Sequence, residues 1–134
     1  MTGNTVRNIV IVEDEEPLAR MMQWQLESHG FSVMRHGNGT EAIRYAAEQR
    51  PDLVVLDLML PDIHGYDVCR RLQKIYHPWS VPILMLTAMD RPIDQLRGFA
   101  HGAFAYLTKP YEEEELIRTI SLLLSEPVSS SSES

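Results

Sequence analysis

Three features are scarce in this chain of 134 residues, and each shortage excludes a class of protein. The single cysteine, Cys69, excludes an internal disulfide. Cations are outnumbered: 12 Lys and Arg against 19 Asp and Glu give a net charge of −7, which argues against a nucleic-acid surface. No apolar run approaches the ~20 residues of a membrane span, and residues 1–4 lack the apolar stretch of a signal peptide. These shortages together predict a cytoplasmic protein without a membrane segment.

Hydrophobic residues make up 44% of the chain, which is enough to bury a core within one domain. Short apolar runs alternate with segments whose apolar residues recur every three to four positions, so the sequence predicts strands that alternate with helices. The predicted strands are 9–12, 31–34, 53–56, 83–86 and 103–107, and the predicted helices are 15–29, 40–50, 65–75, 92–101 and a last one after Pro110. Thr40 is the predicted N-cap of the second helix.

Five strands that alternate with five helices predict an α/β fold, in which a doubly wound parallel sheet is covered by helices on both faces. We expect residues 1–125 to form this domain. Residues 126–134 are rich in serine, and we expect a disordered tail or the start of a linker there.

Polar residues with useful chemistry follow four of the predicted strands. Glu13 and Asp14 follow the first strand, Asp57 follows the third, Thr87 the fourth and Lys109 the fifth. Doubly wound sheets bind ligands beyond the carboxyl ends of their strands, at the switch point of the strand order. We therefore expect these five side chains to converge, and a carboxylate buried at such a strand end usually has a task.

The converging residues match the needs of metal-assisted phosphoryl transfer. Crowded carboxylates repel one another, and Mg²⁺ relieves this because it binds one or two carboxylates, waters and a phosphate. Asp14 and Asp57 can supply the carboxylates, and Glu13 can hold a metal-bound water; Mn²⁺ is the alternative ion. Asp57 is then the nucleophile that becomes an acyl phosphate, while Lys109 and Thr87 bind the phosphoryl oxygens.

Each candidate also has a purely structural interpretation. Asp57 could be a capping carboxylate, Thr87 an N-cap or turn residue, and Tyr106 an ordinary strand aromatic. A flavin-binding protein of the same fold is a further alternative. The anionic loop that begins at Glu13 argues against it, because a flavin phosphate needs hydroxyls and backbone amides.

The chain also resembles the response-regulator receiver domain of two-component signalling over residues 8–125. The matching segments are Val12-Glu13-Asp14-Glu15, Asp57-Leu58-Met59-Leu60-Pro61 with Gly65, Leu86-Thr87-Ala88, and Gly102-Ala103 through Tyr106 to Thr108-Lys109-Pro110. The resemblance implies a flavodoxin-like sheet of order 2-1-3-4-5. It also implies Mg²⁺ ligands at Asp14, Asp57 and the backbone carbonyl of Met59, with Glu13 in place of the commoner aspartate.

The resemblance further implies how the domain works. Asp57 would accept a phosphoryl group from a sensor histidine kinase, a phosphotransfer protein or a small phosphodonor. Thr87 and Tyr106 would form the switch pair, and the peptide bond between Lys109 and Pro110 would be cis. Such a domain changes its own phosphorylation state and turns over no separate substrate, so we expect no enzyme in the usual sense.

The implied output surface is the fourth helix, the fifth strand and the fifth helix, which would act on an output domain or a target protein. Dimerisation through this surface is also implied. Family members that dimerise there through salt bridges usually carry acids at positions 104 and 105, whereas this chain has Phe104 and Ala105. A receiver-like scaffold that binds partners without being phosphorylated is the alternative function.

Overall fold

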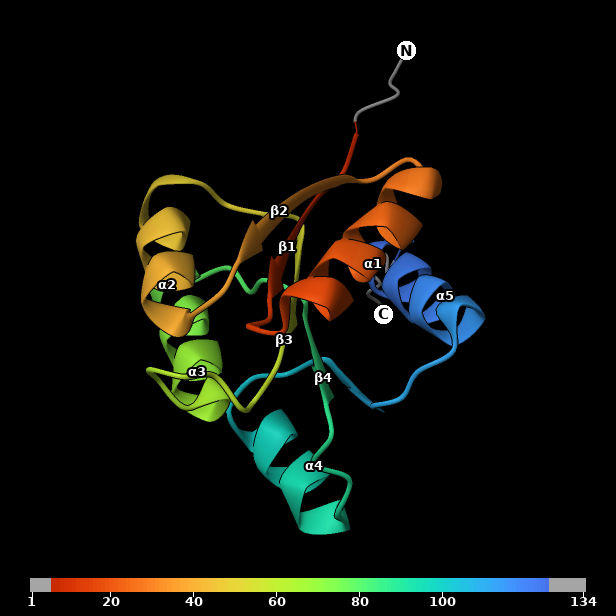
Figure 1. The fold of residues 1–134 in the computed structure, drawn as a ribbon. Coiled ribbons are helices and arrows are strands. Elements are labelled where there is room, and N and C mark those ends of the chain that lie inside the picture. The colour runs from red at the N-terminus through yellow and green to blue at the C-terminus, as the bar shows by residue number, and fades with distance from the viewer. Residues whose placement is uncertain (1–5, 126–134) are drawn as a thin grey trace, which may run out of the picture.

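The computed structural model describes residues 6–125, and ten elements alternate along them as the sequence predicts (Figure 1). The elements are β1 (Asn8–Val12), α1 (Glu16–Ser28), β2 (Ser32–His36), α2 (Gly39–Glu48), β3 (Leu53–Leu56), α3 (Gly65–Tyr76), β4 (Ile83–Thr87), α4 (Pro92–Ala100), β5 (Ala105–Thr108) and α5 (Glu113–Ser125). The predicted tail, residues 126–134, lies outside the described part. Within residues 6–125, no helix has the length and apolar character that crossing a bilayer requires.

The five strands form one parallel sheet in the order β2-β1-β3-β4-β5, which confirms the predicted fold class and strand order. The register aligns the carboxyl ends of the strands. Val12 of β1 pairs with Leu56 of β3, so the residues that follow both strands emerge side by side. Thr87 of β4 pairs with Thr108 of β5, which brings the end of β5 next to β4.

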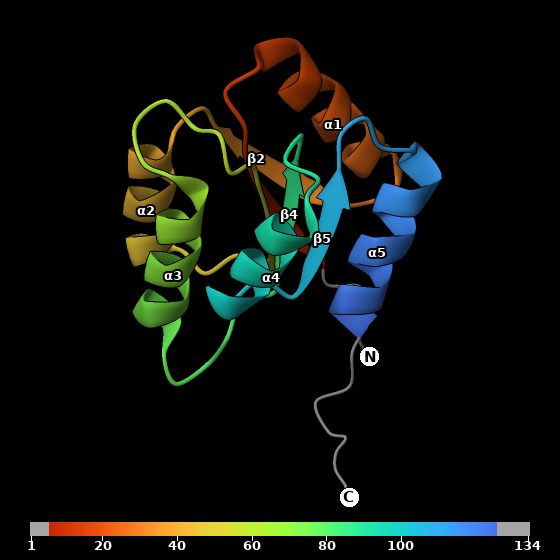
Figure 2. The same ribbon diagram turned by 90° about the horizontal axis from the view of Figure 1, so that it is seen from below.

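Two apolar layers sandwich the sheet, because successive side chains of a strand point to opposite faces. In β1, Ile9 and Ile11 pack in the layer beneath α1 and α5, whereas Val10 and Val12 pack in the layer beneath α2 and α3. Figure 2 shows α1 and α5 on one face and α2, α3 and α4 on the other. Every residue of β3 and β4 is buried, as expected for central parallel strands covered on both faces.

Several element ends differ from the sequence predictions, and local hydrogen bonds explain two of the differences. The N-cap of α2 is Asn38, whose side chain accepts from the Glu41 amide, so the prediction of Thr40 as the cap was wrong. The predicted start of the fifth strand at residue 103 was also early. The Ala103 amide donates to the Gly98 carbonyl of α4 at 3.0 Å, so this residue still closes the helix, and β5 begins at Ala105.

Candidate functional site

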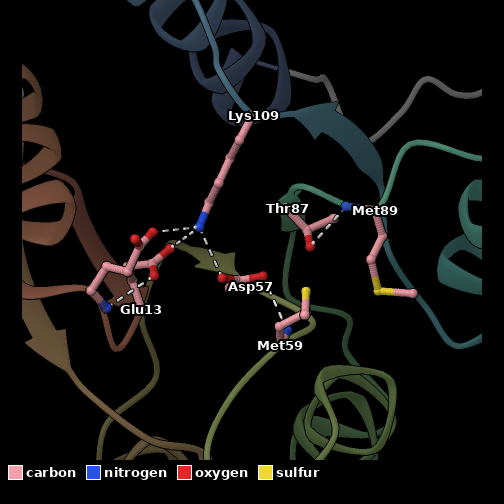
Figure 3. A network of polar contacts seen from close by, with 7 residues as sticks. Glu13, Asp57, Met59, Thr87, Met89 and Lys109 are labelled. Atoms are coloured by element: carbon pink, nitrogen blue, oxygen red, sulfur yellow. Dashed lines mark hydrogen bonds and ion pairs between the residues drawn. The ribbon is translucent and has the colours of Figure 1, made fainter.

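The polar residues at the ends of the strands converge at the carboxyl edge of the sheet. Figure 3 shows Glu13, Asp57, Thr87 and Lys109 there, and Asp14 lies in one cluster with Glu13 and Asp57. Backbone hydrogen bonds between neighbouring strands set their positions. The Asp57 amide donates to the Val12 carbonyl at 3.1 Å, which places Asp57 beside the loop that follows β1. The Lys109 amide donates to the Thr87 carbonyl at 2.8 Å, which continues the pairing of β4 and β5 by one residue.

The Lys109 ammonium joins the acidic residues of the site. Its Nζ lies 2.9 Å from Asp57 Oδ2, 2.8 Å from Glu13 Oε1 and 3.4 Å from Glu15 Oε1. Burial opposes the charge on Lys109, but the hydrogen bonds and ion pairs with Glu13 and Asp57 outweigh it and raise the pKa of the ammonium. Lys109 is therefore a fixed cation whose charge faces the Asp57 carboxylate.

Glu13 is an acid in an unfavourable environment. Its side chain is almost fully buried, and burial raises the pKa of its carboxyl group above the ordinary value. Hydrogen bonds from Lys109 and from the Glu15 amide, the latter at 3.1 Å to Oε2, act in the opposite direction, while the charge of Asp57 adds to the rise. The carboxyl group is thus held in place by donors and is short of compensating positive charge.

The acidic residues meet the requirements of a hard divalent cation. One carboxylate oxygen each from Glu13, Asp14 and Asp57 lies within 4.8 Å of the others, and Asp14 is exposed to solvent. Lys109 pairs with two of these three carboxylates, those of Glu13 and Asp57, so the cluster carries an excess of negative charge that a cation would relieve. Oxygen ligands with an open side for water are the arrangement that Mg²⁺ prefers.

The loop that follows β3 brings a backbone group to the same place. The Met59 amide donates to Asp57 Oδ1 at 3.1 Å, so the Met59 backbone lies against the carboxylate. Gly65 allows this loop to turn tightly into α3. A Cβ at Gly65 would come within 2.6 Å of the Asp57 carbonyl oxygen and 2.4 Å of the Leu58 Cα, so a side chain is excluded there.

Thr87 and Tyr106 are linked through Met89. The Thr87 side chain is fully buried at the end of β4, and its hydroxyl accepts from the Met89 amide at 3.4 Å. The Tyr106 hydroxyl donates to the Met89 carbonyl at 2.7 Å. A Cβ at Gly98 of α4 would lie 3.1 Å from the Tyr106 ring, so the ring packs close against that helix. The peptide bond between Lys109 and Pro110 is cis.

Two aspartates with structural contacts were not among the residues predicted from sequence. Asp94 is buried at the start of α4, where its carboxylate accepts from the backbone and guanidinium of Arg91. The spacing of Asp94 three residues after an N-cap position is a signal that could have identified it. Asp62 accepts hydrogen bonds from the start of α2, and its partners lie 22 and 23 residues away, so no local pattern reveals it.

Comparisons with known proteins agree with the geometry. The family model described as "Response regulator receiver domain" matches residues 9–121. A candidate response regulator from Chloroflexus aurantiacus is similar in structure, with a TM-score of 0.86 and 34% identity over 91% of this chain and 100% of its own.

Two further structures are similar over most of both chains. The BeF₃-activated receiver domain of RstA from Klebsiella pneumoniae has a TM-score of 0.82 and 31% identity, covering 89% of this chain and 99% of its own. The receiver domain of a sensor histidine kinase from Pseudomonas aeruginosa has a TM-score of 0.83 and 30% identity, covering 91% and 100%. That structure has a magnesium ion coordinated in its active-site cleft.

Proposed function

Because the chain belongs to the response regulator receiver domain family of two-component signalling, we propose that it is a phosphorylation-dependent switch whose phosphoacceptor is Asp57. The observation that carries this proposal is the position of the Asp57 carboxylate. It is 5% exposed, contacts the Lys109 ammonium through Oδ2, and lies within the acidic cluster that fits a divalent cation. Glu13 shares the burial, the Lys109 contact and the acidic cluster, but Asp57 follows β3, the middle strand of the sheet, whereas Glu13 follows β1.

The metal site of this proposal uses four residues of the chain. Asp14, Asp57 and the backbone carbonyl of Met59 hold Mg²⁺, and Glu13 holds one of its waters. When bound, Mg²⁺ neutralises charge on the phosphoryl oxygens as they approach Asp57. The magnesium ion in the Pseudomonas aeruginosa receiver domain supports this assignment.

The transfer step forms a bond between an Asp57 carboxylate oxygen and phosphorus, and it breaks the bond from phosphorus to the donor. The donor is a phosphohistidine of a sensor histidine kinase or phosphotransfer protein, or a small acyl phosphate. Lys109 pairs with one phosphoryl oxygen, and the Thr87 hydroxyl donates a hydrogen bond to another. The product is an acyl phosphate on Asp57, and the domain turns over no separate substrate.

The output follows from the contacts at Met89. Movement of the Thr87 hydroxyl towards the phosphoryl group releases the Met89 amide, and the same residue holds the Tyr106 hydroxyl through its carbonyl. Tyr106 and the neighbouring α4 then change position together, which alters the surface formed by α4, β5 and α5. This surface acts on an output domain, a target protein or a second copy of the chain. The BeF₃-activated receiver domain of RstA supports the existence of an activated state.

Incubation with acetyl phosphate and Mg²⁺, followed by intact-mass spectrometry, tests the proposal. We expect the protein to gain the mass of one phosphoryl group, and to gain none when a chelator is present. If neither acetyl phosphate nor a panel of phosphohistidine donors adds mass in the presence of Mg²⁺, the protein is a scaffold and the proposal is wrong.

A further inference from the structure

Asp62 connects the loop that follows Asp57 to helix α2 through hydrogen bonds. Its carboxylate accepts four hydrogen bonds: from the Gly39 amide at 2.9 Å, the Thr40 amide at 2.9 Å, the Thr40 hydroxyl at 2.6 Å and the Ile63 amide at 2.8 Å. Gly39 and Thr40 begin α2, so the bonds join the β3–α3 loop (residues 57–64) to the N-terminus of α2.

The β3–α3 loop is fixed at several points: the Met59 amide donates to Asp57 Oδ1, Leu60 packs against the core, and Asp62 holds the part of the loop that approaches α2. At the start, the Leu58 side chain is buried, and the Leu58 carbonyl accepts from the Gly65 amide at 2.9 Å. Met59, by contrast, has a side chain that is 60% exposed, so core packing does not hold it. The position of the Met59 backbone therefore depends on its hydrogen bond to Asp57 on one side and on the part of the loop that Asp62 holds on the other.

We propose that Asp62 is a positioning residue for the divalent-cation site, because its bonds to the start of α2 hold the Met59 carbonyl where the metal requires it. This inference rests on the proposed function, in which that carbonyl is a metal ligand. Asp62 touches neither the metal nor the phosphoryl group and acts through the loop. Loss of a residue that orients a metal ligand typically lowers metal affinity by about 10- to 100-fold.

The chemistry of the Asp62 contacts suits a permanent anchor. Hydrogen bonds to an ionised carboxylate are stronger than those to a neutral acceptor, and the N-terminus of a helix favours negative charge. The bonds from Thr40, Gly39 and Ile63 hold the pKa of Asp62 far below its usual range. The Asp62 carboxylate is therefore ionised at neutral pH.

The test compares two variants that weaken the start of α2 in different ways. Asp62→Ala removes the bonds between loop and helix, whereas Asn38→Ala removes the N-cap of the same helix and leaves the loop bonds in place. Both variants should lower the melting temperature. We expect Asp62→Ala alone to raise the Mg²⁺ dissociation constant, by about 10-fold, when Mg²⁺ is titrated calorimetrically well below the melting temperature of each variant.

A third variant and a second readout separate positioning from stability. Asp62→Asn keeps one carbonyl oxygen and loses the other acceptor, so its Mg²⁺ affinity should lie between those of the wild type and Asp62→Ala. Without metal, the amides of Met59 and Leu60 should exchange hydrogen faster in Asp62→Ala than in Asn38→Ala.

The outcomes distinguish this inference from the proposed function. If the wild type binds Mg²⁺ and Asp62→Ala binds it equally well, Asp62 has no positioning role and the proposed function stands. If Asn38→Ala loses as much affinity as Asp62→Ala, the effect belongs to the stability of α2 and the inference is wrong. If the wild type binds no Mg²⁺, both the proposed function and this inference are wrong.

Discussion

Polar groups are arranged in opposite ways at the two ends of the parallel strands, that is, at the edge of the sheet where the strands begin and at the edge where they end. At the edge where the strands begin, polar groups have matched hydrogen-bond partners: Asp52 accepts from the Asn8 amide at 2.7 Å, and the Tyr76 hydroxyl donates to the Gln49 carbonyl at 2.9 Å. The Arg50 guanidinium also lies over the Tyr76 ring. At the edge where the strands end, the Lys109 ammonium pairs with Glu13, Asp57 and Glu15, and Asp14 lies in the same acidic cluster.

This difference shows where the protein accepts a cost in stability. Burying charges without full compensation is unfavourable, so stability alone would favour the pairing seen at the first edge. Glu13 and Asp57 are nevertheless buried together at the second edge, beside a single lysine. Arrangements that lower the free energy of unfolding are retained in proteins where a functional site requires them. We therefore assign function to the edge where the strands end, and we expect variants at the two edges to differ in their effects on phosphorylation and on stability.

The largest contrast compares two aspartates that lie next to the same strand. Asp57→Ala should abolish phosphorylation by acetyl phosphate, because the nucleophile is gone. Asp52→Ala removes the partner of the Asn8 amide at the opposite edge and should keep full phosphorylation. Intact-mass spectrometry of both variants measures the contrast. Phosphate gained by Asp57→Ala on an acid-stable bond would contradict the assignment of the acceptor.

The next contrast concerns Asp14, the exposed member of the acidic cluster. Asp14→Ala should lower the phosphorylation rate at a fixed Mg²⁺ concentration by about 100-fold, as expected for loss of a metal ligand, and the remaining rate should no longer respond to a chelator. Its melting temperature without Mg²⁺ should change little, because an exposed side chain contributes little to packing. An unchanged rate that still requires Mg²⁺ would remove Asp14 from the metal site.

A smaller effect concerns the stability cost of Glu13. Burial raises the pKa of Glu13 in the folded protein, so the folded protein binds a proton at Glu13 more readily than the unfolded chain does. The free energy of unfolding therefore falls as the pH rises from the ordinary glutamate pKa through the pKa of Glu13 in the folded protein. At neutral pH without metal, Glu13→Gln should therefore melt a few degrees above the wild type. The gap should close as the pH is lowered to the ordinary glutamate pKa, which thermal melts across that range can measure. If the difference in melting temperature grew as the pH was lowered, the direction of the pKa shift of Glu13 would be wrong.

The smallest effect on function belongs to the edge where the strands begin. Tyr76→Phe removes the hydroxyl that donates to the Gln49 carbonyl, and it should lower the free energy of unfolding by about 1 kcal/mol. The phosphorylation rate should equal that of the wild type. Chemical denaturation and phosphorylation kinetics measured on the same preparation check both statements. A slower rate in this variant would show that the two edges are coupled and would weaken the contrast.

The sequence predicted the fold and the converging residues because both depend on local patterns. Central parallel strands are continuous apolar runs, and the residues after them meet at one edge whenever the strands are parallel. Asp57, Thr87 and Lys109 could be found in this way, although their functional roles remain proposals.

The rest of the site depends on contacts between distant segments. Asp62 binds the start of α2, more than 20 residues earlier, and no periodicity encodes that contact. The wrong choice of Thr40 over Asn38 has a related cause. Both residue types are good N-caps, and the extended backbone at Asn38 with the engagement of Thr40 by Asp62 decides between them.

The most direct test of the account is to locate the phosphoryl group. The protein is incubated with acetyl phosphate, with Mg²⁺ or with a chelator, and then treated with borohydride, which reduces an acyl phosphate of aspartate to homoserine. Peptide mass spectrometry then reads position 57. The account predicts homoserine there in the Mg²⁺ sample and aspartate in the chelator sample. Unreduced Asp57 in both samples, with the phosphate on a serine or threonine, would contradict it.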